Sequence, residues 1–140
     1  LNLEARSAML MASMMGSVAF QKGLGVIHSC AHALSACFNL HHGLANGIMI
    51  DHCLHWNYPV IKHKLERLER FLDLKAHGGL NFIAWVTSLK KNLSIPSHLS
   101  KVNVTITDRL IEEAYQDPCH QSNPQSCSKE DFISIFKTAF

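Results

Sequence analysis

The stretch that decides the fold and the site is Gly23-Leu24-Gly25-Val26-Ile27-His28-Ser29-Cys30-Ala31-His32, followed after residues 33–41 by His42-Gly43-Leu44-Ala45-Asn46-Gly47. Its residues are mostly apolar or small, which predicts a well-packed helix on each side of a break at residues 39–43. His28 and His32 are four residues apart, so on a helix their side chains lie on one face, one turn apart. His42 follows the break, and a second helix could return it to the same point.

Neutral imidazoles presented in this way can share one metal ion, because each offers a nitrogen lone pair. The spacing alone favours His28 and His32 as the ligand pair. The zincin signature requires Glu directly after the first histidine, and Ser29 stands there, so that mechanism is not supported. A histidine on an apolar face is more often a core residue with one hydrogen bond. The pattern therefore leaves a metal site and a structural role both open.

Composition limits the class of protein. The 140 residues, 47% hydrophobic and 17% charged, predict one globular domain, 1–140, with a real core. The formal net charge is only +2, and no Lys/Arg cluster is interleaved with aromatic residues, so we expect no nucleic-acid partner. The five cysteines form no CxxC pair, which favours a reducing, cytoplasmic compartment. No secretory signal and no uninterrupted apolar run of membrane-spanning length is visible, so we expect no membrane association.

Apolar periodicity predicts an all-α helical bundle without a sheet. The residues expected to be helical are 3–22, 26–38, 44–56, 60–74, 80–93, 108–116 and 129–140. Asn57-Tyr58-Pro59 is expected to end the third helix, and Gly78-Gly79 to form a turn. Val102–Ile106 alternates like a strand, but a single short strand lacks partners, so we expect a loop.

The first predicted helix carries apolar residues at helical spacing and small residues between them. The apolar positions are Leu3, Leu10, Met14, Met15 and Val18. This pattern predicts a helix that packs on two sides, with methionine as core filler. Thr107 or Asp108 is expected to cap a later helix, and Ser128 with Asp131 loosely matches a capping box before the last one.

Two motifs together resemble the signature of the iron-containing (group III) alcohol dehydrogenases. The first is Ala19-Phe20-Gln21-Lys22-Gly23-Leu24-Gly25-Val26-Ile27-His28 with His32, and the second is His42-Gly43-Leu44-Ala45-Asn46-Gly47-Ile48. Ile95-Pro96-Ser97-His98-Leu99 and Asp117-Pro118-Cys119-His120-Gln121-Ser122-Asn123-Pro124 extend the resemblance over nearly the whole chain. It implies the all-helical C-terminal domain of the dehydroquinate synthase-like / iron-containing alcohol dehydrogenase fold, a metal-binding domain. The family's N-terminal nucleotide-binding domain is absent from residues 1–140.

The resemblance also assigns roles to individual residues. His28 and His42 match the family's two metal-binding histidines of this half, which replaces the pair favoured by spacing. His32 matches a further active-site histidine that lies near the metal, and is expected to be catalytic by relaying a proton or holding a water. Phe20 and Cys119 are expected to line the substrate pocket by their place in the motifs, although a plain loop thiol explains Cys119 equally well. The family's other two ligands, an Asp and a His, lie outside the matching stretch.

The function implied by the resemblance is that of an NAD(P)-linked alcohol dehydrogenase that interconverts alcohols and aldehydes or ketones. Fe²⁺ is the expected metal, with Zn²⁺ as the alternative, and NAD(P) would be bound mainly by the N-terminal half. We expect the 140 residues alone to be inactive and to bind metal weakly. The expected partner is a small alcohol or aldehyde, and homo-oligomer formation stays open.

Two other functions compete with this one. The chain could be a non-catalytic helical module that binds a partner through the methionine-rich face of its first helix. It could also be a small zinc domain built on histidines, which would lose its helices on chelation. The lack of a cysteine pair at ligand spacing makes the zinc domain the weakest of the three.

Overall fold

The computed structural model describes residues 2–140, and within them every regular element is helical, which confirms the all-α prediction. The elements in chain order are α1 (Leu3–Phe20), α2 (Val26–Phe38), α3 (His42–Phe71), α4 (Leu80–Asn92), η1 (Leu99–Val102), α5 (Asp108–Gln116), η2 (Pro118–Ser122) and α6 (Lys129–Thr138). Short 3₁₀ turns at η1 and η2 lie outside the ranges expected to be helical. Residues 103–106 form no strand, as expected.

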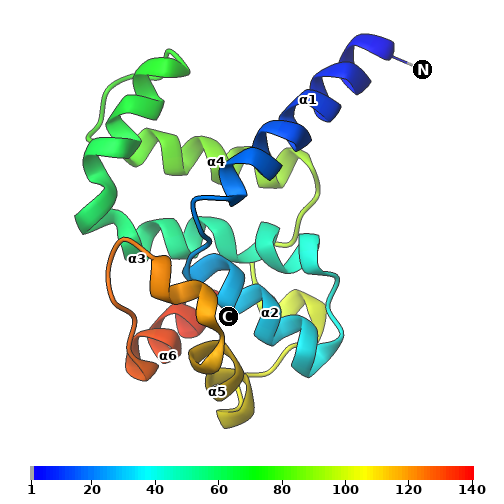
Figure 1. Ribbon diagram of the computed structural model, residues 1–140, viewed down its shortest axis with the longest axis vertical. Coiled ribbons are helices and arrows are strands. Elements are labelled where there is room, and N and C mark those ends of the chain that lie inside the picture. The colour runs from blue at the N-terminus through cyan, green and yellow to red at the C-terminus, as the bar shows by residue number, and fades with distance from the viewer. Residues whose placement is uncertain (1) are drawn as a thin grey trace.

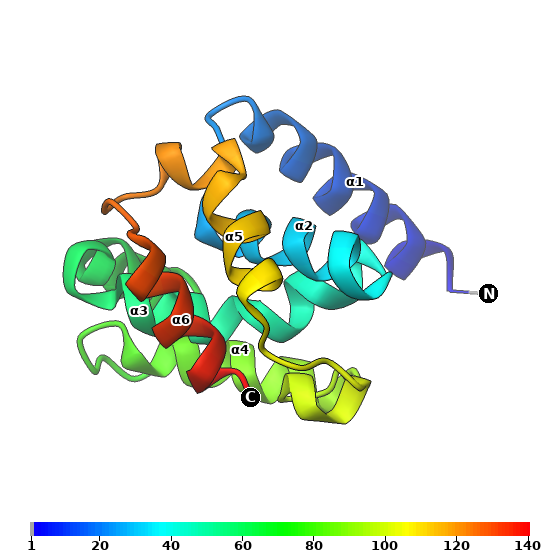
Figure 2. The ribbon, with the colours of Figure 1, turned by 90° about the horizontal axis from the view of Figure 1, so that it is seen from below.

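Helix α2 lies at the centre of the body, between α3 and α5 (Figures 1 and 2). Its buried face carries Val26, Cys30 and Leu34. The core continues into α6, where Phe132 and Phe136 are fully buried. Each buried side chain of this size stabilises the fold by about 1.5–3 kcal/mol. Helix α2 is therefore held by packing from several directions between Val26 and Leu34.

The predicted helix caps at Thr107 and Ser128 are present. The Thr107 side chain accepts a hydrogen bond from the backbone N–H of Leu110 at the start of α5. Ser128 and Asp131 form a reciprocal capping box at the start of α6. Each cap satisfies an N–H group that the helix leaves unpaired, which is worth about 1 kcal/mol. These local signals fix where the two helices begin.

The predicted helix end at Pro59 is wrong, because α3 continues through Pro59 to Phe71. Proline removes one N–H and disturbs the carbonyl one turn before it. Next to that carbonyl, the Gln125 side chain donates to the Trp56 carbonyl oxygen at 2.9 Å. Buried Asn57 also exchanges side-chain hydrogen bonds with Asn123. Contacts from the segment before α6 therefore support the helix where proline weakens it, and Figure 1 shows that α3 changes direction along its length.

The expected packing of the first helix is also wrong. No residue of α1 is buried, and Leu10 and Met15 are 71% and 63% exposed. Figures 1 and 2 show α1 reaching out from the body, with its N-terminal end far from the other helices. The apolar periodicity correctly predicted a helix, but within residues 2–140 no other helix packs against its apolar face.

Candidate metal centre

One short connection between α2 and α3 brings His42 back toward the histidines of α2. Asn39 adopts a left-handed conformation (φ 51°) and ends α2, and its N–H donates to the Ser35 carbonyl oxygen. The Ser35 hydroxyl donates to the Leu40 carbonyl oxygen at 2.9 Å. The three-residue connection 39–41 thus reverses the chain, so that α3 runs back beside α2 (Figure 1). His42 begins α3 at this reversal.

The imidazole rings of His28, His32 and His42 form one cluster. The centroid of the His42 ring lies 5.5 Å from that of His28 and 5.1 Å from that of His32. The His28 and His32 centroids are 5.9 Å apart. The structure therefore brings together all three histidines that the sequence singled out, from both sides of the helix break.

Burial keeps one member of the cluster uncharged. It lowers the pKa of His28 below the usual value, and the neighbouring rings of His42 and His32 lower it further, while Asp117 opposes them. The ring of His28 is therefore neutral at neutral pH and carries a free lone pair. A neutral imidazole is the form that binds a metal ion.

The His42 ring is held by its own helix. The Asn46 side chain, one turn later on α3, donates from Nδ2 to His42 Nε2 at 3.0 Å and to the His42 carbonyl oxygen. His42 Nε2 is therefore an acceptor whose lone pair is directed at Asn46 Nδ2, so a metal ion bound at Nε2 would displace this hydrogen bond. The Asn46 Oδ1 atom is buried and has no hydrogen-bond partner among residues 2–140. A buried acceptor without a donor is costly.

The donor set fits a divalent transition metal. Two imidazoles on one ion at about 2.1 Å per bond have ring centroids roughly 4.5–5.5 Å apart. The separations of 5.1–5.9 Å found here are close to that range. Imidazole nitrogen suits Fe²⁺ and Zn²⁺, whereas Mg²⁺ and Ca²⁺ prefer oxygen.

Asp117 binds the opposite side of the cluster, and sequence reasoning gave it no role. It lies between α5 and η2, and its carboxylate accepts from His32 Nδ1, from the Ser29 hydroxyl and from the Cys119 backbone N–H, each at 2.8 Å. Burial raises the pKa of Asp117, but these hydrogen bonds outweigh burial and hold it below the usual value. The only sequence signal was its place directly before Pro118 in a quoted motif.

The two residues expected to line a substrate pocket differ in position. Cys119 lies beside the cluster, with its sulfur 3.9 Å from His32 Nδ1. Burial and the neighbouring Asp117 raise the pKa of its thiol to about 11, so it is uncharged at neutral pH. Phe20 ends α1 and is 55% exposed. Its substrate-pocket role stays a prediction, as does that of Cys119.

A different combination of ligand atoms is also close together. One atom each from His32, Asp117 and Cys119 lie within 4.8 Å of one another, near enough to hold a metal ion. This set shares only His32 with the histidine cluster. Asp117 Oδ2 already accepts from His32 Nδ1, and its Oδ1 accepts from Ser29 and the Cys119 N–H, so an ion held by this set would have to displace some of these hydrogen bonds.

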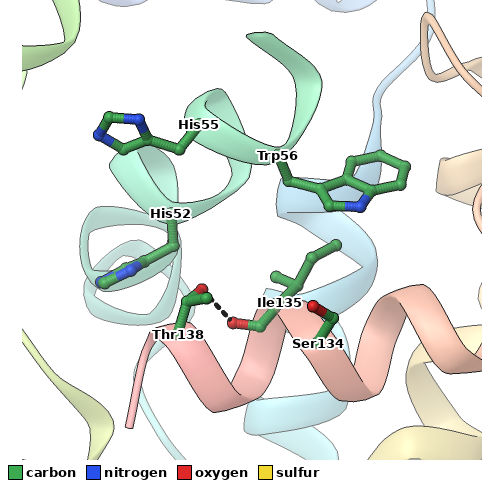
Figure 3. A pocket seen from close by; sticks show the side chains of 6 residues that line it. All are labelled: His52, His55, Trp56, Ser134, Ile135 and Thr138. Carbon is green, nitrogen blue, oxygen red and sulfur yellow. Dashed lines mark hydrogen bonds between the residues drawn. The ribbon is translucent and has the colours of Figure 1, made fainter. Parts of the chain in front are cut away.

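Two cavities of the molecule lie away from the histidine cluster. One of about 410 Å³ separates α3 from α6 and is lined by His52, His55, Trp56, Ser134, Ile135 and Thr138 (Figure 3). Another, of about 590 Å³, lies between α3, α4 and residues 94–101. None of the three clustered histidines lines either cavity. His32 is 41% exposed at its side chain, so the cluster lies on an open face of the body.

Comparison with known proteins identifies the family. All 140 residues match the model of the Fe-containing alcohol dehydrogenase family, C-terminal. The 4-hydroxybutyrate dehydrogenase of Cupriavidus necator is 34% identical over 140 residues, which cover 92% of this chain and 36% of that protein. The lactaldehyde reductase of Escherichia coli K12 is 32% identical over 126 residues, covering 84% of this chain and 33% of that protein.

A solved structure agrees with these matches. The crystal structure of a 1,3-propanediol oxidoreductase superimposes with a TM-score of 0.92 at 30% identity, over 99% of this chain and 39% of that chain. Fold and relatives together define a helical domain of the alcohol oxidoreductases. The chain belongs to the Fe-containing alcohol dehydrogenase family and corresponds to its C-terminal domain. Its matches cover 33–39% of the length of these relatives.

The length and apolar character of each helix can be compared with what a membrane-spanning helix needs. Across residues 2–140, none combines the length and the apolar character that crossing a bilayer requires.

Proposed function

We propose that this chain supplies two metal ligands, His28 and His42, to an NAD(P)-linked alcohol dehydrogenase whose catalytic ion is Fe²⁺, or Zn²⁺ as the alternative. The observation that supports the proposal most is the meeting of three imidazoles from two helices on one face of the body. The names of its relatives, which reduce aldehydes or oxidise alcohols, support a small alcohol or aldehyde as substrate.

When bound, the ion supplies Lewis-acid polarisation of the substrate oxygen, and the nicotinamide carries the hydride. The residues of this chain then have separate tasks. His28 and His42 bind through neutral ring nitrogens, and the lowered pKa of His28 keeps its lone pair available. His32 holds or moves the proton of the substrate hydroxyl, since histidine changes charge near neutral pH. Phe20 and Cys119 contact the substrate.

Location and assembly follow the same proposal. Five free thiols favour a reducing compartment, and we place the protein in the cytoplasm. We expect NAD(P) to be bound mainly by residues outside this chain, so the 140 residues alone should not oxidise propanol. Measurable NAD-linked propanol oxidation by the chain would contradict that expectation. Homo-oligomer formation remains open, and the exposed α1 is a surface through which it could occur.

The metal role is tested by titrating Zn²⁺, and Fe²⁺ without oxygen, into the 140-residue chain in a calorimeter. We expect a dissociation constant weaker than about 1 µM, because the imidazoles present leave the coordination shell half filled. His28→Ala and His42→Ala should each weaken binding at least about tenfold, since each removes a ligand. His32→Ala should have a smaller effect.

The control is His63→Ala, which removes an exposed histidine of α3 outside the cluster and should leave the affinity unchanged. Affinity that survives both His28→Ala and His42→Ala would overturn the proposed ligand pair. Affinity lost mainly in His32→Ala and Cys119→Ala would move the metal to the other set of ligand atoms. Sub-micromolar binding by the unaltered chain would contradict the expectation of a half-filled shell.

The second candidate function is a non-catalytic helical interaction module. One observation favours it, namely the row of exposed apolar side chains along α1. Exposed apolar patches of this kind mark interaction surfaces in soluble proteins. The two functions separate by metal dependence, because a module of this kind needs no intact histidine cluster.

A further inference from the structure

We propose that Asp117 is a positioning residue, which fixes His32 with its proton on Nδ1 and leaves Nε2 as the atom that exchanges a proton with the substrate. This rests on the proposed function of His32. The position of the proton on His32 can nevertheless be measured without any catalysis.

The geometry around Asp117 divides its carboxylate into two roles. Oδ1 accepts from the Ser29 hydroxyl and from the Cys119 N–H, both at 2.8 Å. Oδ2 accepts from His32 Nδ1, also at 2.8 Å. The carboxylate is therefore clamped through one oxygen, and the other is presented to the imidazole. Its side chain is 14% exposed, so water competes little for these contacts.

The chemistry of the pair fixes the donor. A carboxylate without a proton can only accept hydrogen bonds, so the His32 nitrogen that meets it must carry the hydrogen. In a neutral imidazole the other nitrogen then holds the lone pair. An isolated histidine has no such constraint, and the choice of nitrogen follows from whichever hydrogen bond the ring makes.

His32 Nε2 is consequently available for proton transfer. It makes no hydrogen bond to any residue in the 2–140 range, and its ring lies against the rings of the two proposed metal ligands, His28 and His42. When a substrate hydroxyl gives up its proton, the O–H bond breaks and an N–H bond forms at Nε2. The positive charge that the ring gains then faces the Asp117 carboxylate, which stabilises it.

Ser29 and Cys119 acquire a role in this arrangement. Each donates one hydrogen bond to Asp117 Oδ1, and the two together keep the carboxylate from turning. Ser29 is on α2, one turn before His32 on nearly the same face, and Asp117 is 85 residues further along the chain. The clamp thus joins the central helix to the start of η2.

The test is long-range nitrogen–proton NMR on the 15N-labelled 140-residue chain without metal, recorded at a pH at which the nitrogen shifts show the His32 ring to be neutral. We expect His32 to carry its hydrogen on Nδ1. In Asp117→Asn, the Ser29 hydroxyl and Cys119 N–H still require an acceptor and orient the amide oxygen toward themselves. The amide NH₂ then faces His32, so the hydrogen should move to Nε2. The ratio of the two forms should change more than about tenfold, because a hydrogen bond is gained on one side and lost on the other.

Ser29→Ala is the matched control, because it removes one clamp contact but leaves the carboxylate. It should keep the hydrogen on Nδ1, as should the exposed-site change His63→Ala. A hydrogen on Nε2 in the unaltered chain would overturn the proposal even if Asp117→Asn fails to fold. A Zn²⁺ titration in which the hydrogen leaves His32 Nδ1 would also overturn the proposal. That result would mean that the ion is held by His32, Asp117 and Cys119. If Nδ1 carries the hydrogen while His28→Ala and His42→Ala leave the metal affinity unchanged, the proposed ligand pair is wrong and the positioning role of Asp117 is supported.

Discussion

At the scale of single residues, the sequence predicted the histidine cluster but not the side chains that hold it. His28 and His32 are one helical turn apart, and the helix break before His42 is readable from local signals. Asp117 hydrogen-bonds to His32 although the two are 85 residues apart in the sequence, and hydrophobic periodicity cannot predict such a long-range contact. Long-range pairs depend on how helices pack, which a single sequence does not encode locally.

A second long-range pair missed by the sequence joins α3 to α4. Lys90 Nζ donates to Asp51 Oδ1 and, at 2.8 Å, to the Ile48 carbonyl oxygen. Thr87 donates to the other carboxylate oxygen of Asp51 at 3.0 Å. Both charged residues are buried, at 5% exposure for Lys90 and 7% for Asp51. Either charge without its partner would be buried and uncompensated.

The free energy of unfolding at acid pH should depend on the Lys90–Asp51 ion pair. Burial raises the pKa of Asp51, but the hydrogen bond and charge of Lys90 outweigh it and lower that pKa below the usual value. A lowered folded-state pKa means stabilisation that is complete above the unfolded pKa, about 3.9 for Asp. That stabilisation is lost as the pH falls through the folded pKa. Urea unfolding at a series of pH values measures the loss.

In the variant Lys90→Met, the contribution of Asp51 to the pH dependence of the free energy of unfolding should change sign. The Asp51 carboxylate would then be buried with only the His52 ring nearby, 3.7 Å from Oδ1, and burial lowers the pKa of that ring, so the folded pKa of Asp51 would rise above the unfolded one. We expect a loss of about 3 kcal/mol at neutral pH, partly recovered on mild acidification as Asp51 takes up a proton. The matched control is Lys91→Met, which changes the next, exposed lysine and should follow the unaltered chain. If the free energy of unfolding varied with pH in the same way in Lys90→Met and Lys91→Met, the stabilising role of the Lys90–Asp51 pair would be contradicted.

At the scale of elements, local signals located most helices and failed where packing outweighed them. The limits of α2 (Val26–Phe38) and the caps of α5 and α6 were predicted correctly from side-chain chemistry within a few residues. The helix end at Pro59 was not, because Gln125 and Asn123 support α3 from a distant part of the chain. Proline lowers the local preference for helix, and tertiary contacts can exceed that cost.

The turn between α3 and α4 offers a sharp test of element packing. Gly79 has a φ of 89°, and a Cβ there would lie 2.5 Å from the Leu65 Cβ and 3.3 Å from the Glu66 backbone nitrogen. Gly79→Ala therefore combines a strained backbone with a clash against atoms that cannot move aside. We expect a loss of about 2–4 kcal/mol in the free energy of unfolding, measured in urea with an unchanged slope.

Gly16→Ala is the control for that experiment. Gly16 lies inside α1, and a Cβ there meets nothing within 4 Å. Alanine should favour the helix by about 1 kcal/mol, seen as an equal or stronger far-ultraviolet helical signal. A Gly79→Ala chain as stable as the unaltered one would show that the turn relaxes, and that α4 is not fixed against α3 by this contact.

At the scale of the whole molecule, the sequence predicted the class of fold but not which surface stays uncovered. Helical periodicity in α1 correctly indicated a helix with an apolar face. It carries no information about the partner of that face, and among residues 2–140 no helix covers it. The core around α2, by contrast, is closed from several sides, so apolar patterning there matched burial.

The exposed face of α1 should make the chain associate with itself at high concentration. Leu10, Met14 and Val18 recur every four residues on one side of the helix and are 56–71% exposed. We expect the apparent mass in size-exclusion chromatography to rise with protein concentration, because association removes this apolar surface from water. Leu10→Glu should shift the rise to about tenfold higher concentration, since burying a carboxylate in the contact costs more than 1.4 kcal/mol. Ala12→Glu, about 200° around the helix from Leu10, adds the same charge on the other side and should change the profile less. A strict monomer at every concentration, with α1 still helical by circular dichroism, would show that this face alone does not drive association.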